Sequence, residues 1–202
     1  MKTIVVTGGI GSGKSEVCRY LEGKGVPVYY ADLEVKRLYF QDKDLFPSIE
    51  RALGQKLSYK DEKEKLSALA DIIFSSPSAL ETVESIVHPA LLKDFLHWKE
   101  KQKGEEWKGY AGKEPFVVIE SAIILEKPVF NSSYDAVIIV EAPENLRLSR
   151  TLLRDGGGED KIRKIMSLQK INKAKASCII SNDSDLAALY KSTDRAFENL
   201  EI

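Results

Sequence analysis

The sequence lacks long apolar runs, an excess of charge of either sign, and all but two cysteines. Its longest apolar stretches, such as residues 136–140, are far shorter than the roughly 20 residues that a membrane-spanning helix needs. Gly8 and Gly9 also interrupt the first apolar stretch at once, which argues against a secretory signal peptide. We therefore expect no membrane partner.

The charge is nearly balanced, with 30 lysines and arginines against 31 aspartates and glutamates and a net charge of −1. A chain without a basic field is not expected to bind nucleic acid non-specifically. The two cysteines, Cys18 and Cys178, are too few for a disulfide framework and have no metal-ligating neighbours. A reducing cytoplasm is therefore the expected location. The chain has 202 residues, of which 43% are hydrophobic, and this is enough for a packed core.

Short β-branched runs alternate with longer stretches of helical periodicity, which predicts an α/β fold with a parallel sheet of about five strands flanked by helices. The predicted strands cover residues 3–7, 26–30, 116–119, 135–140 and 178–180. Several are continuously apolar, as strands covered on both faces must be. Helices are expected from the first loop to about Leu21 and over about 143–154, 160–176 and 184–200.

The spacing changes after the second predicted strand, where almost wholly helical residues run up to Phe116. This is too long for one crossover, so we expect a helical insertion at 32–112 within a core formed by 1–31 and 113–202. Its helices are predicted near 33–39, 61–74 and 78–103, and Pro89 should break or kink the last one. Residues 99–112 are polar and contain glycine, which favours a surface connector.

Residues 8–15 spell Gly-Gly-Ile-Gly-Ser-Gly-Lys-Ser, which fits G-x-x-x-x-G-K-[ST] between a predicted strand and a predicted helix. Glycines let successive N–H groups turn inward around an anion, and the start of the next helix adds partial positive charge. Lys14 can then reach the β- and γ-phosphates of ATP, and the Ser15 hydroxyl can hold Mg²⁺. A glycine-rich turn without a ligand is the much weaker alternative. The residues expected to bind the nucleotide are Gly8, Gly9, Gly11, Ser12, Gly13, Lys14, Ser15 and Glu16.

Asp32 follows the second predicted strand directly. Ligands of open α/β sheets gather at the carboxyl ends of the strands, so a carboxylate there can accept the proton of an attacking hydroxyl. Asp is also a common N-cap, and the helix expected at 33–39 could need one. From its position alone, both interpretations of Asp32 stay open.

Four landmarks in order resemble those of the dephospho-CoA kinase family. They are the loop Thr7–Ser15, Ala31-Asp32, Ile86-Val87-His88-Pro89 and Arg154-Asp155-Gly156. The resemblance covers nearly the whole chain. It implies a P-loop core with a helical insertion that binds coenzyme A and a helical lid, here at about 145–170. It also implies transfer of the ATP γ-phosphoryl group to the ribose 3′-hydroxyl of dephospho-CoA, the last step of coenzyme A biosynthesis.

By this resemblance Asp32 is the proposed general base, and His88 helps to bind the acceptor. Glu120, at the end of the third predicted strand, could contact Mg²⁺-bound water or the acceptor ribose. The segment after it departs from the family pattern, because it keeps a carboxylate at each end, Glu120 and Glu126, but lacks the usual proline and aromatic residue. A capping or salt-bridging role for Glu120, and a packed or helix-kink role for His88, remain open.

Arg147, Arg150 and Arg154 are spaced by three and four residues, so they share one helical face. Such a row is usually a solvated surface. In a lid, however, it could close over the triphosphate, neutralise developing charge and exclude water. We expect the catalytic residues to be Lys14, Asp32, Arg150 and Arg154, of which the two arginines contact the phosphates. Whether Arg147 also contacts them stays open.

Two other functions compete with this hypothesis. Another small-molecule or nucleoside monophosphate kinase would use the same phosphate chemistry with a different acceptor. A nucleotide-dependent switch is disfavoured, because the guanine-binding pattern Asn-Lys-x-Asp has only a partial match at 172–175. The expected partners are ATP, Mg²⁺ and a small-molecule acceptor, with the protein acting as a monomer or a small homo-oligomer.

Overall fold

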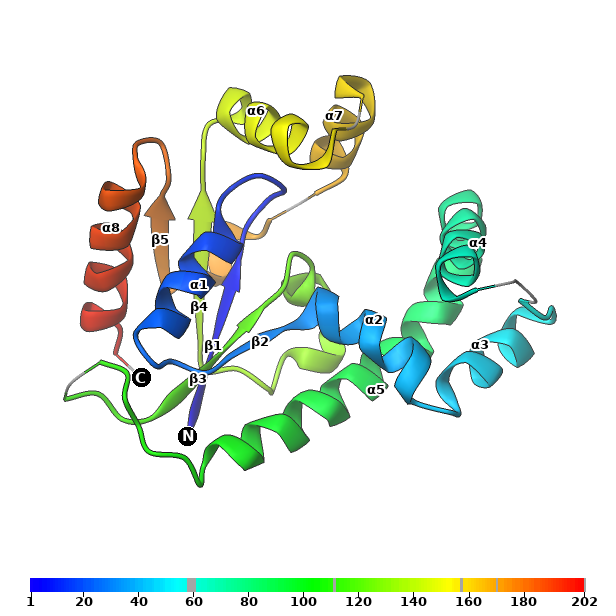
Figure 1. The fold of residues 1–202 in the computed structure, drawn as a ribbon, viewed down its shortest axis with the longest axis horizontal. Helices are drawn as coiled ribbons and strands as arrows, with labels where there is room; N and C mark the ends of the chain where they lie inside the picture. The colour runs from blue at the N-terminus through cyan, green and yellow to red at the C-terminus, as the bar shows by residue number, and fades with distance from the viewer. Residues whose placement is uncertain (58–60, 111, 157, 170, 202) are drawn as a thin grey trace. The chain divides into compact units, whose positions relative to one another are not determined.

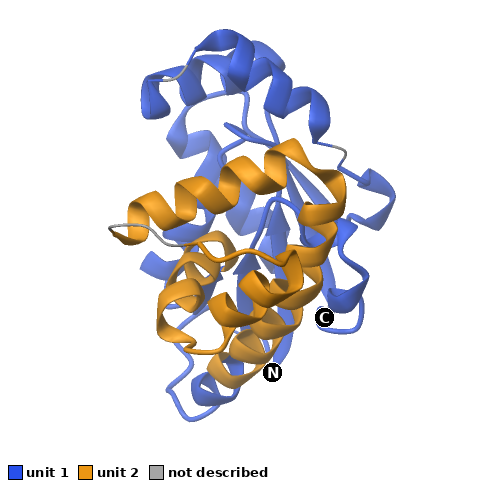
Figure 2. Cartoon of the chain, turned by 90° about the vertical axis from the view of Figure 1, so that its right-hand side faces the viewer, with its two compact units in different colours: residues 1–30, 99–202 blue, residues 31–98 orange. Residues whose placement is uncertain are grey.

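The computed structural model describes residues 1–57, 61–110, 112–156, 158–169 and 171–201. Gly157 and Lys170, which fall inside the expected lid, lie outside the described residues. The chain divides into two compact units, residues 1–30 with 99–202 and residues 31–98 (Figure 2). Among the described residues, no helix is both long and apolar enough to span a membrane.

The first unit is built on a five-stranded sheet in the order β2-β3-β1-β4-β5, and every neighbouring pair is parallel (Figure 1). This confirms the predicted fold class. Both faces of the central strands are buried, which explains their continuous apolar sequences. The strands are β1 (Lys2–Thr7), β2 (Val28–Tyr30), β3 (Phe116–Glu120), β4 (Ala136–Glu141) and β5 (Cys178–Ser181).

One face of the sheet forms a core with helices α1 (Lys14–Gly23) and α8 (Leu186–Asn199). Alternate residues of β1, Ile4 and Val6, point into this core with Leu21 of α1 and Phe197 of α8. Because all strands run the same way, their carboxyl ends share one edge of the sheet (Figure 1). The loop that precedes α1 begins at this edge, directly after β1.

The lid region consists of two helices, α6 (Glu144–Asp155) and α7 (Glu159–Leu168). Helix α7 is shorter than the helix predicted at 160–176, because Gln169 leaves the helical conformation. A separate 3₁₀ turn, η3 (Lys173–Lys175), follows, and the Asn172 side chain caps it by accepting from the Ala174 N–H at 3.1 Å. Gly156 ends α6 with a left-handed φ of 63°, which favours glycine.

Residues 99–112, expected to be a surface connector of the insertion, belong to the first unit. The connector carries two aromatic anchors that its polar composition hides. Tyr110 is buried and stacks on Phe197 with ring centroids 5.8 Å apart. The Trp107 ring packs edge-on against Phe116 at 5.0 Å. These contacts fasten the connector to the core of the sheet.

The second unit is helical, as expected of the insertion. It contains α2 (Ala31–Gln41), α3 (Leu45–Leu53), α4 (Glu62–Ser75) and most of α5 (Pro77–Gln102). Helix α3 was not predicted, although Leu45, Phe46 and Ile49 form its buried face. The start of α5 at Pro77 is confirmed.

Pro89 was expected to break or kink the helix, and no break occurs: α5 continues through Pro89. A proline removes one backbone hydrogen bond of the helix. The helix keeps the same buried face on both sides of Pro89, with Val83, Val87, Leu91 and Phe95 at intervals of four residues. Burial of this stripe holds the two halves in one helix.

Candidate functional site

The loop between β1 and α1 has the backbone that an anion cradle needs. Gly11 and Gly13 have φ values of 74° and 99°, in the region that favours glycine, and the Ser12 N–H donates to the Gly9 carbonyl at 3.0 Å. Gly13 stands at the N-cap position of α1 without a side chain to cap the first N–H groups. These groups and the helix dipole therefore point toward an incoming anion.

Close packing around the loop leaves no room for side chains at its glycines. A Cβ on Gly13 would collide with the side-chain amide of Asn182, and one on Gly11 with the Arg147 carbonyl. The Ser12 hydroxyl is buried and has no hydrogen-bond partner in the described part of the chain. A buried hydroxyl in this state is an unsatisfied polar group that a ligand oxygen could satisfy.

Lys14, Ser15 and Glu120 meet at the carboxyl ends of β1 and β3. The Lys14 Nζ lies 3.6 Å from Glu120 Oε1, and the Ser15 hydroxyl donates to the same oxygen at 3.3 Å. Only 12% of the Lys14 side chain and 5% of the Glu120 side chain are exposed. The structure thus brings together three of the predicted site residues, and Glu120 does form the salt bridge that was one interpretation of it.

The three arginines of α6 do not act as one row. The Arg147 Nε donates to the Ile10 carbonyl at 2.9 Å, and its guanidinium covers Gly9. Arg154 instead forms a two-pronged pair with its neighbour Asp155, at 2.6 and 2.8 Å, and its side chain is 59% exposed. The Asp155 hydrogen bonds raise the pKa of Arg154.

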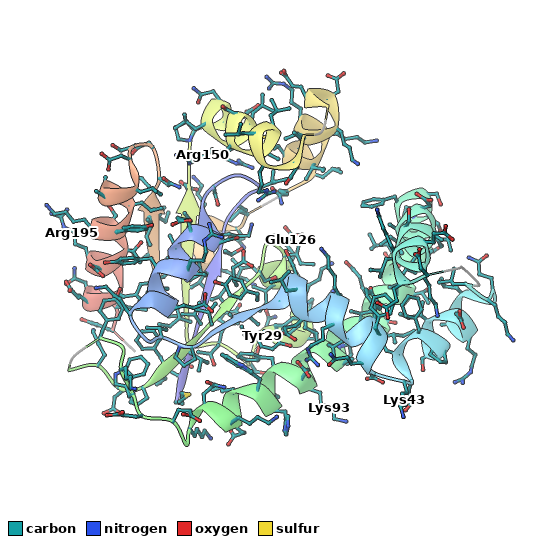
Figure 3. The ribbon with its side chains drawn as sticks, viewed as in Figure 1. Tyr29, Lys43, Lys93, Glu126, Arg150 and Arg195 are labelled. Carbon is teal, nitrogen blue, oxygen red and sulfur yellow. The ribbon has the colours of Figure 1, made fainter. Side chains whose placement is uncertain are left out.

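Arg150 lies above the carboxyl edge of the sheet (Figure 3). Its guanidinium donates to the backbone carbonyl of Asn182 at 3.1 Å and to the Asn182 side-chain oxygen at 3.4 Å. Arg150 therefore connects α6 with the loop that follows β5.

Asn182, which the sequence analysis leaves unassigned, lies against the glycine loop. It is buried directly after β5, and its amide donates to the Ser12 carbonyl at 2.8 Å. Its position at the end of a strand was the one signal that could have identified it. Asn182 also borders an open pocket of roughly 730 Å³, whose lining includes Gly13, Glu16, Arg150 and Leu186.

Glu16, expected to bind the nucleotide, already has partners at the side of this pocket. The Tyr190 hydroxyl donates to its carboxylate at 2.6 Å, and Arg19 forms an ion pair with it. These hydrogen bonds, with that of Tyr190 the strongest, lower the pKa of Glu16. The Glu16 side chain thus fixes α1 against α8, and its backbone N–H donates to the Gly13 carbonyl at 3.0 Å.

Asp32 and His88 belong to the second unit. Asp32 is exposed, is the second residue of α2, and makes no hydrogen bond or ion pair within the described residues. The capping role considered for it is therefore not observed. Along the chain, Asp32 comes two residues after Tyr30, and Tyr30 pairs in register with Glu120 in the sheet. His88 lies within α5, half-buried and just before Pro89.

Comparison with known proteins gives one consistent result. Residues 2–188 match the family model described as dephospho-CoA kinase. A relative from Porphyromonas gingivalis named dephospho-CoA kinase is 38% identical over 170 residues, which are 84% of this chain and 78% of the relative.

Solved structures share the fold. The crystal structure of TT1252 from Thermus thermophilus has a TM-score of 0.77 at 24% identity, over 99% of this chain and 98% of the other. The dephospho-CoA kinase from Campylobacter jejuni has a TM-score of 0.67 at 20% identity, over 98% and 96% of the two chains.

Proposed function

This chain belongs to the dephospho-CoA kinase family, and from this premise we propose how its residues transfer the γ-phosphoryl group of ATP to dephospho-CoA. The family makes it an ATP-dependent kinase of coenzyme A biosynthesis. The observation that carries the proposal is the meeting of the glycine loop, Lys14, Ser15 and Glu120 at one edge of the sheet.

The loop binds the triphosphate in this proposal. Backbone N–H groups of Gly11 and of residues 13–15 surround the phosphates, and the Lys14 ammonium moves from Glu120 toward the β- and γ-phosphates. The buried Ser12 hydroxyl, which has no partner among the described residues, gains a phosphate oxygen as its acceptor. The pocket beside Gly13 and Asn182 takes the nucleotide base, with the planar Arg150 guanidinium at its wall.

Mg²⁺ fits the oxygen atoms next to this cradle. It prefers a carboxylate or two together with phosphate and water oxygens, and the Ser15 hydroxyl and Glu120 carboxylate offer such ligands side by side. Ser15 would hold the ion directly, and Glu120 directly or through water. Bound there, Mg²⁺ would neutralise charge on the phosphates.

The helical insertion, the unit of residues 31–98, supplies the acceptor side. His88 binds dephospho-CoA, and Asp32 orients the ribose 3′-hydroxyl and accepts its proton. The hydroxyl oxygen forms a new bond to the γ-phosphorus while the bond from that phosphorus to the β-bridging oxygen breaks. The electron pair of the broken bond leaves with ADP, and coenzyme A is the other product.

The lid, at about 145–170, completes the site by covering the phosphates. Arg150 and Arg154 stabilise charge on the transferred group, since guanidinium donors match phosphate oxygens. Arg154 must exchange its Asp155 partner for phosphate when the lid closes.

Both cysteines are free, which agrees with action in a reducing cytoplasm.

A coupled assay for ADP release tests the proposal. Dephospho-CoA should support turnover at a rate at least about 10²-fold above AMP, CMP, shikimate or gluconate, because a site that pairs with a specific acceptor rejects others strongly. Mass analysis of the product should show coenzyme A. Faster turnover with one of the other acceptors would assign the chain to a different kinase activity, and ADP release without any acceptor would indicate a nucleotide hydrolase.

A further inference from the structure

Ile10 lies at the tip of the glycine loop, and the lid region binds both its backbone N–H and its backbone carbonyl. Its N–H donates to the Gln169 side-chain oxygen at 2.8 Å, and its carbonyl accepts from the Arg147 Nε at 2.9 Å. Arg147 lies on α6 at the beginning of the lid, while Gln169 follows the last residue of α7. One backbone position thus links the two ends of the lid segment.

Further contacts between α6 and the loop confirm that this arrangement is tightly fitted. The Arg147 guanidinium lies over Gly9, and the Arg147 carbonyl lies against Gly11, where an added Cβ would collide. The Thr151 hydroxyl donates to that carbonyl at 2.7 Å and packs on Gly11 as well. Three consecutive loop residues, 9–11, therefore form the face that contacts the lid.

Neither hydrogen bond at Ile10 uses a group assigned to the phosphates. The backbone groups proposed to bind the nucleotide are the N–H groups of Gly11 and of residues 13–15, which begin one residue after Ile10. Gln169 can therefore keep its hydrogen bond to Ile10 while a nucleotide is bound. The Gln169 side chain binds the loop backbone and not the phosphates. We therefore expect Gln169 to fix the loop without taking part in the chemistry.

We propose that Gln169 is a positioning residue that, with Arg147, clamps Ile10 and couples phosphate binding in the loop to the position of the lid. A loop whose tip is already fixed loses less conformational freedom when it binds phosphate. By linkage, a nucleotide in the loop must in turn stabilise the lid segments that hold it. This inference rests on the proposed nucleotide site but concerns a residue outside it.

The clamp itself can be tested without any nucleotide, by hydrogen exchange of the Ile10 amide in ¹⁵N-labelled protein. Replacing Gln169→Leu keeps the approximate size of the side chain but removes the acceptor. We expect Ile10 exchange to accelerate about three- to tenfold, the effect of one ordinary hydrogen bond. Gln169→Glu restores an acceptor oxygen and should keep the exchange rate within about twofold of the wild type.

The coupling is tested by binding of ADP to the same proteins. Gln169→Leu should weaken ADP binding about three- to tenfold and reduce the protection that ADP gives to amides of α6 and α7, at an unchanged melting temperature. Lys161→Ala, an exposed change on α7, is the matched control and should alter neither quantity.

The outcomes separate this inference from the proposed function. Unchanged Ile10 exchange in Gln169→Leu would refute the clamp, and faster exchange with unchanged ADP affinity and lid protection would refute the coupling. If the wild-type protein failed to bind ADP, the nucleotide site would be wrong, while the exchange result would still decide whether Gln169 holds the loop.

Discussion

Glu120 contacts two groups that a nucleotide would use. The Lys14 ammonium and the Ser15 hydroxyl share its Oε1, in a place where little of either charged side chain is exposed. A buried charge needs a partner of opposite sign. Glu120 therefore supports the Lys14 charge, and this salt bridge is compatible with the Mg²⁺ role proposed for Glu120 above.

Replacing Glu120→Gln should expose this double role. The amide keeps the shape but loses the charge, so we expect kcat/KM to fall at least tenfold and the Mg²⁺ concentration for half-maximal rate to rise. Initial rates measured across a Mg²⁺ titration would show both effects. Glu126→Gln is the matched control, because this carboxylate at the far end of the same segment is exposed. Equal Mg²⁺ dependence in the two variants would remove Glu120 from the metal site.

Arg154, proposed above to contact the transferred phosphoryl group, is paired with Asp155 in the structure. Its bidentate pair with Asp155 is exposed, and exposed pairs contribute little to stability. Arg154→Ala should therefore fold normally but lower turnover tenfold or more, because the charge on the transferred phosphoryl group loses a donor. The comparison is with Arg163→Ala on α7, whose exposed ion pairs join Glu144 and Glu159. Turnover that matches this control would show that Arg154 is only a surface residue.

At the scale of elements, the strands were predictable and the segments between them less so. Nearly continuous apolar runs identify β1, β3 and β4, because strands buried on both faces have few polar positions. Helix α3 was missed because it is short and contains Pro47. The connector before β3 is mostly exposed, as predicted, but composition alone could not show that Tyr110 is buried in the core and that Trp107 packs against it.

Helix α8 is joined to α1 and to this connector by one carboxylate, Asp194. The hydroxyls of Tyr20 and Tyr110 donate to it at 2.7 and 2.9 Å, and the Lys24 ammonium lies at 2.6 Å. Burial by itself would raise the pKa of Asp194, but the three donors outweigh it and lower the pKa. A carboxyl with a lowered pKa stabilises the fold above its unfolded pKa of about 3.9 and loses that effect as the pH falls through the folded value.

Asp194→Asn should therefore lower the free energy of unfolding by about 1–3 kcal/mol at pH 7. The difference from the wild type should shrink below about pH 4, as the wild-type carboxylate becomes protonated. Urea unfolding at several pH values between 7 and 3 measures it. Asp71→Asn, at an exposed position in α4, is the control for general charge effects. A difference that stayed constant down to pH 3 would mean that the Asp194 charge contributes nothing.

For the whole molecule, the sequence located the phosphate cradle because its chemistry is local. Residues 8–15 are consecutive, so spacing alone identifies them. Asn182 and Gln169 reach the same loop from 170 and 159 residues away, and such contacts depend on the order of strands and the course of the lid. The arginine row was predicted from helical spacing, but spacing cannot show that Arg147 binds the loop and Arg150 binds Asn182.

In the proposed mechanism, Asp32 of the insertion accepts the proton of the hydroxyl that attacks the ATP held by the nucleotide-binding unit. The structure leaves the Asp32 carboxylate exposed and without a partner in the described chain, so the carboxylate is accessible to an acceptor hydroxyl. The most direct test is a rapid-quench, single-turnover measurement of phosphoryl transfer from γ-labelled ATP to dephospho-CoA in the wild type and in Asp32→Asn, with ATP affinity measured on both. The predicted result is a fall in the transfer rate of about 10²-fold or more, with ATP affinity changed by less than about threefold. A variant that transferred the phosphoryl group at the wild-type rate would contradict the account.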